Sequence, residues 1–99
     1  MEAEEIIALL PYQSPFLFVD DIVAVSENQI TGHYTFKEDE FFYEGHFKDN
    51  PITPGVILTE CMAQIGLVCL GMYLVKDELR NSQKPQIALT SHQMDFYLP

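Results

Sequence analysis

Basic residues are scarce in this chain. Its 99 residues include five lysines and arginines against 15 aspartates and glutamates, so the formal net charge is −10 at neutral pH. Nucleic acids and anionic membranes attract positively charged surfaces, and an excess of negative charge repels them. The composition therefore argues against nucleic acid and against a membrane surface as partners.

Cysteine is scarce as well. Cys61 and Cys69 are the only two, and they lie eight positions apart on an expected helix. That spacing separates their Cα atoms by roughly 12 Å, which is too far for a disulfide. We therefore expect two reduced thiols in the core. The opening residues MEAEE are acidic, whereas a secretion signal begins with basic residues, and this favours the cytoplasm.

Several signatures of binding and catalysis are missing. The sequence contains no glycine-rich phosphate loop, no nucleophile elbow and no Cys-His nucleophile pattern. Its three histidines and Glu60 lack the spacing of metal ligands, so we expect neither a metal site nor a bound cofactor. His33 and His92 are expected on the surface.

Apolar residues are abundant, at 47% of the chain, and no segment is repetitive. These features predict one folded domain over residues 1–99, near the size at which a single core is only modestly stabilising, so that a partner subunit would help. The pattern predicts the following elements: a short helix over 2–10, a strand over 15–25, a second strand from about Gln29 that forms an antiparallel hairpin with the first, a long helix from Pro54, and a strand over 87–98.

The most informative stretch is residues 43–73, a loop followed by an apolar helix. Two glycines and two prolines, which favour turns and interrupt helices and strands, fix the backbone path of the loop: Gly45, Pro51, Pro54 and Gly55. His46 lies within this loop. Thr53 is a suitable N-cap and Pro54 a suitable first helical residue. The helix that follows is apolar on every face, and such helices are buried.

Glu60 is the one acid in this helix. A carboxylate in an apolar setting needs a hydrogen-bonding partner, and Gln64, one turn later, lies on the same face. Glu60 also follows shortly after the helix start, where the N–H groups of Gly55, Val56 and Ile57 can bind a developing negative charge. A histidine, an acid and such a helix start are the groups needed to remove water from a 3-hydroxyacyl thioester.

The residues that carry this chemistry also resemble a known family, the FabZ-type 3-hydroxyacyl-[acyl-carrier-protein] dehydratases, which have the hot-dog fold. The opening segment LLPYQSPFLFVDDI, residues 9–22, is similar to the start of that family. The matching motifs are Gly45-His46-Phe47, Pro51, Pro54-Gly55-Val56, Glu60 and Ala63-Gln64. The resemblance implies an α+β protein in which an antiparallel sheet wraps a long central helix.

The resemblance also implies roles. His46 would be the base at C2, Glu60 the acid at the departing hydroxyl, and the Gly55 N–H the donor to the thioester oxygen. His46 and Glu60 of one site would come from different subunits, so the minimal active unit would be a homodimer or a higher homo-oligomer. The substrate would be a thioester of acyl carrier protein or of coenzyme A.

Five residues complete the expected substrate site: Gly55, Val56, Gln64, Phe47 and Lys48. Gln64 would orient Glu60. Phe47 belongs to a cluster of aromatic residues that either packs the core or walls an acyl chain. Lys48 either meets a phosphate of the substrate at the pocket mouth or is an ordinary solvated loop residue.

Three departures from the family leave alternatives open. Lys48-Asp49-Asn50 replaces the Pro-Gly that usually follows His-Phe, and Tyr12 stands where histidine is common. The expected strands are too few to wrap the helix, so either C-terminal strands are missing from this chain or another subunit covers the edge. The alternatives are a hot-dog thioesterase, in which Glu60 activates water, and a noncatalytic subunit or assembly module.

Overall fold

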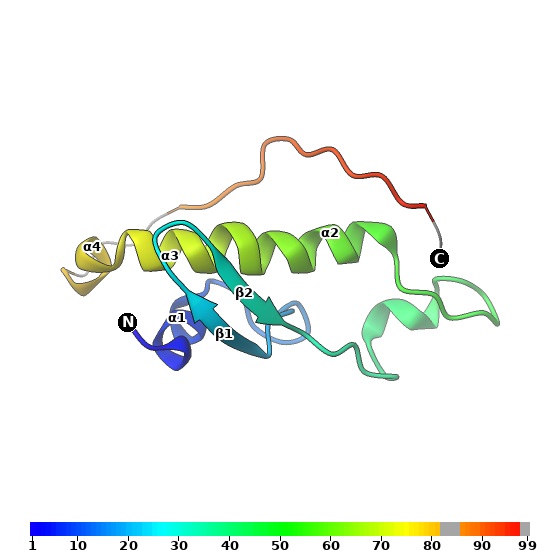
Figure 1. The fold of residues 1–99 in the computed structure, drawn as a ribbon. Helices are drawn as coiled ribbons and strands as arrows, with labels where there is room; N and C mark the ends of the chain where they lie inside the picture. The colour runs from blue at the N-terminus through cyan, green and yellow to red at the C-terminus, as the bar shows by residue number, and fades with distance from the viewer. Residues whose placement is uncertain (82–85, 98–99) are drawn as a thin grey trace.

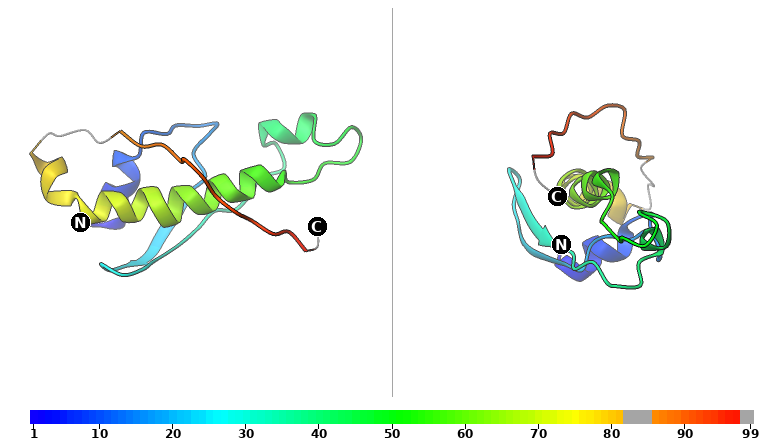
Figure 2. Two further views of the ribbon diagram at one scale, coloured as in Figure 1. Left: turned by 90° about the horizontal axis from the view of Figure 1, so that it is seen from above. Right: turned by 90° about the vertical axis from the view of Figure 1, so that its right-hand side faces the viewer.

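The structure is a computed structural model that describes residues 1–81 and 86–97. Its elements are α1 (Ala3–Leu9), β1 (Asp21–Val25), β2 (Ile30–His33), η1 (Phe41–Glu44), α2 (Gly55–Ala63), η2 (Gln64–Cys69), α3 (Leu70–Leu74) and α4 (Lys76–Arg80). The long helix lies between α1 and the β1–β2 hairpin on one side and extended residues 86–97 on the other (Figures 1 and 2). The predicted α+β class is confirmed.

The hairpin forms where the alternating pattern predicts it. β1 and β2 are antiparallel, with Asp21 opposite His33 and Val25 opposite Ile30, and a bulge separates Ile22 from Ala24. Gly32 faces the long helix. A Cβ there would lie 3.0 Å from the Ile65 side chain of the helix and 2.9 Å from the Asp21 carbonyl oxygen of β1, so glycine permits this close approach of sheet and helix. His33, on the other face, is exposed as predicted.

The long helix begins one residue later than predicted. α2, η2 and α3 form one continuous helix of 20 residues, Gly55–Leu74, whose middle section is π-helical. Its N-cap is Pro54 and not Thr53, because the Thr53 hydroxyl is hydrogen-bonded to the Tyr43 hydroxyl instead. The helix ends at Leu74, since the backbone of Val75 leaves the helical region before α4 begins.

The strand predicted over residues 15–25 is wrong in its first part, and the strand predicted over residues 87–98 is not part of a sheet. Residues 15–20 are not a strand, because side chains of the long helix form hydrogen bonds with the backbone there. The Gln64 side-chain oxygen accepts from the Phe18 N–H, and the Cys61 thiol donates to the Phe18 carbonyl. Residues 87–97 are extended but unpaired, since no strand of the described chain lies beside them. The predicted end of that strand, Leu98, lies outside the described residues.

The core consists of two clusters on the inner side of the long helix. The larger joins α1 and β1 to the second half of the helix: Ile6, Leu10, Val19, Ile22, Val68, Cys69 and Met72. The smaller is aromatic and gathers Phe18, Phe42 and Ile57 at the first half. The prediction of reduced thiols is confirmed. Burial raises the pKa of Cys69 to about 11, so this thiol is neutral and packs as a small apolar group.

The outer face of the helix remains partly uncovered. Val56, Met62 and Leu67 are each at least half exposed, and the helix is long and apolar enough to cross a membrane by length and composition alone. The core helix of a soluble protein passes the same test. This helix packs its inner face on the hairpin and holds residues 16–18 through a buried glutamine, which are contacts of a core helix.

Candidate active site

His46 is held by its backbone and its ring. Its N–H donates to the Phe42 carbonyl of η1 at 3.0 Å, and its own carbonyl accepts from the Ile52 N–H at 2.8 Å. The ring Nδ1 lies 2.9 Å from the Ile52 carbonyl oxygen. A carbonyl only accepts, so Nδ1 carries the proton and Nε2 presents its lone pair. In this tautomer Nε2 can accept a proton or a hydrogen bond.

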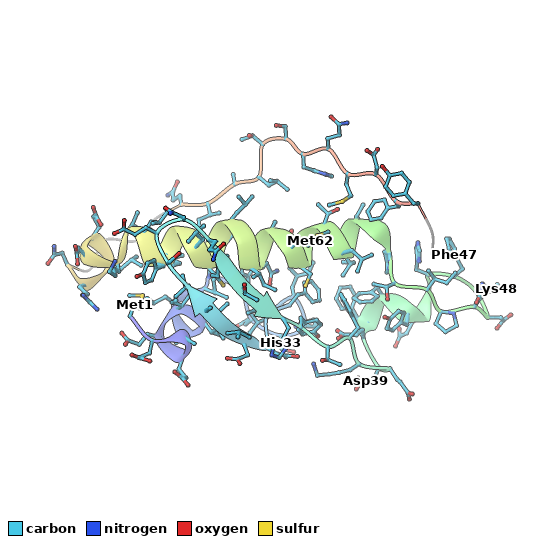
Figure 3. The ribbon with its side chains drawn as sticks, in the orientation of Figure 1. Met1, His33, Asp39, Phe47, Lys48 and Met62 are labelled. Atoms are coloured by element: carbon cyan, nitrogen blue, oxygen red, sulfur yellow. The ribbon has the colours of Figure 1, made fainter. Side chains whose placement is uncertain are left out.

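The residues after His46 close a small turn at the end of the molecule. Phe47 and Asn50 exchange two backbone hydrogen bonds, which leaves Lys48 and Asp49 at the tip. The Phe47 ring stacks on the His46 ring with centroids 3.9 Å apart and planes 29° apart. Figure 3 shows Phe47 and Lys48 on this loop, beyond the start of the long helix. Both side chains are exposed, so the ring of Phe47 lies outside the core and packs on the ring of His46.

Asp49 adopts a left-handed backbone conformation, with φ of 59°. This conformation disfavours residues with a Cβ, and aspartate tolerates it better than most because its short side chain bonds locally. Asp49, at the position of the expected glycine, thus holds a conformation that glycine adopts without cost.

We expect Asp49→Ala to lower the free energy of unfolding by about 1 kcal/mol and Asp49→Gly to leave it unchanged or higher. The two variants remove the same charge and differ only in their tolerance of positive φ. Urea denaturation of both proteins measures the difference. Equal midpoints would show that the left-handed conformation costs nothing at this position.

The start of the long helix lies beside the histidine. His46, Gly55 and Leu58 line one cavity of about 600 Å³, together with Ile52, Thr53, Phe96 and Tyr97. The Phe96 ring packs on Gly55 so closely that a Cβ there would lie 3.0 Å from it. Within the described residues the N–H groups of Gly55 and Val56 have no acceptor, whereas the Ile57 N–H donates to the Pro54 carbonyl. Of the three predicted N–H donors, Ile57 is therefore occupied.

Glu60 and Gln64 form the predicted pair. The Gln64 amide donates to the Glu60 carboxylate at 2.9 Å and to the Phe16 carbonyl at 3.1 Å, and its oxygen accepts from the Phe18 N–H at 2.8 Å. Gln64 is completely buried. Both of its amide hydrogens are used within the protein, so it positions Glu60 and has no N–H left for a substrate.

Glu60 lines a second cavity, of about 400 Å³, that follows the second half of the helix. Its other lining residues are Tyr12, Phe16, Ala63, Leu67, Val68, Gly71, Met72, Val75, Ile87, Ala88 and Leu89. This cavity is mostly apolar. The prediction from sequence missed most of these residues because three separate segments contribute them.

One chain does not bring His46 and Glu60 together. They line different cavities. Glu60 lies five positions after Gly55 on the helix, which turns it about 140° away from the helix face of Gly55. The chain therefore presents two half-sites of the predicted pair, one with His46 and the helix start, the other with Glu60. Two predicted substrate-binding residues, Val56 and Lys48, line neither of these two cavities. The Val56 side chain is 72% exposed.

Residues 1–81 and 86–97 contain no cluster of three or more side chains that could hold a metal ion. Tyr12 and Phe96 are the site residues that the sequence signalled least. Tyr12 was noticeable only as an unusual residue in the opening motif, and Phe96 only as one more aromatic in a predicted strand.

Comparison with known proteins finds relatives of one kind. Three curated relatives are named 3-hydroxyacyl-[acyl-carrier-protein] dehydratase FabZ. The protein of Acinetobacter baylyi is 46% identical over 65 residues, which cover 66% of this chain and 44% of the relative. The protein of Petrotoga mobilis is 40% identical over 81 residues, which cover 82% of this chain and 55% of the relative. The protein of Ehrlichia chaffeensis is 37% identical over 92 residues, which cover 85% of this chain and 64% of the relative.

This chain thus spans about half the length of the curated relatives it matches. A family model described as a FabA-like domain matches residues 10–97. The match includes both the segment that binds Gln64 and the Phe96 ring that packs on Gly55. Because that match covers most of the chain, the protein belongs to the FabA-like family.

Proposed function

We propose that this protein removes water from 3-hydroxyacyl thioesters and releases trans-2-enoyl thioesters. The observation that carries the proposal is the His46 ring, whose Nδ1–H is fixed on the Ile52 carbonyl and which lines a cavity at the start of the helix. In the reaction Nε2 takes the proton from C2, the C–H electrons form the C2=C3 bond, and the C3–O bond breaks. Glu60 gives its proton to the departing hydroxyl, which leaves as water.

The helix start would stabilise the charge that develops on the thioester oxygen. The free N–H groups of Gly55 and Val56 point out of the first helical turn, where the helix dipole favours negative charge. Gly55 is the closer to His46, since both line one cavity. We assign the Gly55 N–H to the thioester oxygen. The reaction needs no metal and no cofactor.

The separation of the two half-sites supports an active homodimer or higher homo-oligomer. In a twofold dimer the His46 cavity of one subunit would face the Glu60 cavity of its partner, which would create two equivalent sites. The exposed apolar residues on the outer face of the helix, among them Met62 and Leu67, provide surface for such an interface.

The names of the relatives support a carrier-protein thioester as substrate, and coenzyme A would present the same phosphopantetheine arm. Lys48 is the cation nearest the site in sequence and would meet a phosphate of that arm. The acidic composition continues to disfavour nucleic acids and membranes as partners, and we propose a cytoplasmic location. We also propose that residues 1–99 belong to one domain.

Mass spectrometry of a 3-hydroxyacyl thioester incubated with the protein tests the proposal. We expect the loss of one water, with turnover reduced at least about 100-fold in both His46→Ala and Glu60→Gln, because each variant lacks one proton-transfer group. Circular dichroism checks that both variants remain folded.

The other outcomes distinguish the two alternatives. Release of free acid and thiol would identify a thioesterase. No change of any substrate, on a panel of chain lengths bound to carrier protein or to coenzyme A, would support a noncatalytic hot-dog subunit. Wild-type turnover in either variant would contradict the assigned roles.

A further inference from the structure

The Glu60 cavity contains one polar side chain besides the acid. Ten of its lining residues carry no polar side-chain group, and the exceptions are Glu60 and Tyr12. Glu60 and Tyr12 are therefore the only side chains lining this cavity that can hydrogen-bond a hydroxyl group of a ligand, and an unpaired hydroxyl in an apolar place costs about 1–3 kcal/mol.

Tyr12 is held beside the acid by the same contacts that orient Glu60. It follows the buried Leu10 after α1, and the next residues form a turn in which the Phe16 N–H donates to the Gln13 carbonyl at 2.9 Å. The Phe16 carbonyl in turn accepts from the Gln64 amide, which also binds Glu60. One buried amide therefore ties the Tyr12 segment and the Glu60 carboxylate to a common position.

The Tyr12 hydroxyl has no hydrogen-bonding partner within residues 1–81 and 86–97, and Tyr12 is only partly buried. Desolvation by burial, the nearby Glu60 carboxylate and Cys69 all raise the pKa of Tyr12 above its usual value. The phenol thus keeps its proton at neutral pH and can act as a donor. Such a donor beside an acid fits an oxygen atom that gains negative charge.

We propose that Tyr12 donates a hydrogen bond to the 3-hydroxyl of the substrate and positions it for the proton of Glu60. Tyr12 keeps its own proton throughout, and Glu60 supplies the one that leaves in water. The effect of Tyr12 on the reaction rate rests on the proposed dehydration. The hydrogen bond between Tyr12 and the 3-hydroxyl does not, because ligand binding can be measured without turnover.

Binding of two matched ligands tests the contact. The protein carries His46→Ala to prevent turnover, with and without Tyr12→Phe, and calorimetry measures the Kd of a 3-hydroxyacyl pantetheine thioester and of the same thioester without the hydroxyl. We expect Tyr12→Phe to weaken the hydroxylated ligand about 3- to 10-fold and to leave the other within about 2-fold, because only one ligand has a partner for the phenol. Equal weakening of both ligands would show a purely structural role, and no weakening of either would place Tyr12 outside the site.

Turnover in the otherwise wild-type protein tests the consequence. Tyr12→Phe should lower kcat about 10- to 100-fold with a smaller effect on KM, since the donor acts most strongly on the charge of the transition state. Tyr12→His, which restores a donor, should recover part of the loss. Thermal melting of each variant checks its fold. An unchanged kcat in Tyr12→Phe would overturn the catalytic part. If the wild-type protein dehydrates nothing, the proposed function fails, whereas the binding cycle still decides the contact.

Discussion

A heterodimer of two inactive variants should recover about half of the wild-type activity, because one of its two sites is intact. The two subunits are His46→Ala and Glu60→Gln, each inactive as a homodimer. If a site takes His46 from one subunit and Glu60 from the other, one site of the heterodimer combines both substitutions and the second combines neither. The physical basis is the separation of His46 and Glu60 into different cavities of one chain.

A second heterodimer provides the matched control. It pairs a wild-type subunit with one that carries both His46→Ala and Glu60→Gln, so the total number of substitutions is the same. Shared sites predict no activity here, since each site would contain one substitution. Two affinity tags allow either heterodimer to be purified and its dehydration rate measured. Activity in the second heterodimer and none in the first would show that each site lies within a single chain.

Gln64→Ala should be the most destabilising single substitution in the site. It would leave the buried Phe18 N–H and the part-buried Phe16 carbonyl without partners, and it would open a cavity. Buried polar groups without partners cost about 1–3 kcal/mol each, so we expect the free energy of unfolding to fall by about 2–5 kcal/mol. That is a large part of the stability of a small domain.

Urea denaturation measures this loss, and Gln93→Ala is the matched control. Gln93 is exposed on the extended segment and makes no hydrogen bond within the described residues, so its loss should change the stability by less than about 0.5 kcal/mol. A Gln64→Ala protein as stable as Gln93→Ala would show that water replaces the buried amide without cost.

Local patterns in the sequence were enough for the elements whose partners are close by. The hairpin was predictable because alternating residues and a polar turn bring neighbouring segments together. The long helix was predictable because it is continuous and apolar, although its cap and its end at Val75 were not. The strand prediction over residues 15–20 was wrong because the side chains of Gln64 and Cys61, more than 40 positions away, hold that backbone. No local pattern contains this information.

The sequence by itself determined the residue types of the site, the pairing of Glu60 with Gln64 and the position of the helix start next to His46, since these depend on short spacings. Only the tertiary structure decided that His46 and Glu60 of one chain lie in different cavities, and that Tyr12 lines the cavity of Glu60. The physical reason is the geometry of the helix. A spacing in sequence sets the angle between two side chains on a helix, but the segments packed against each face determine which cavity a side chain enters.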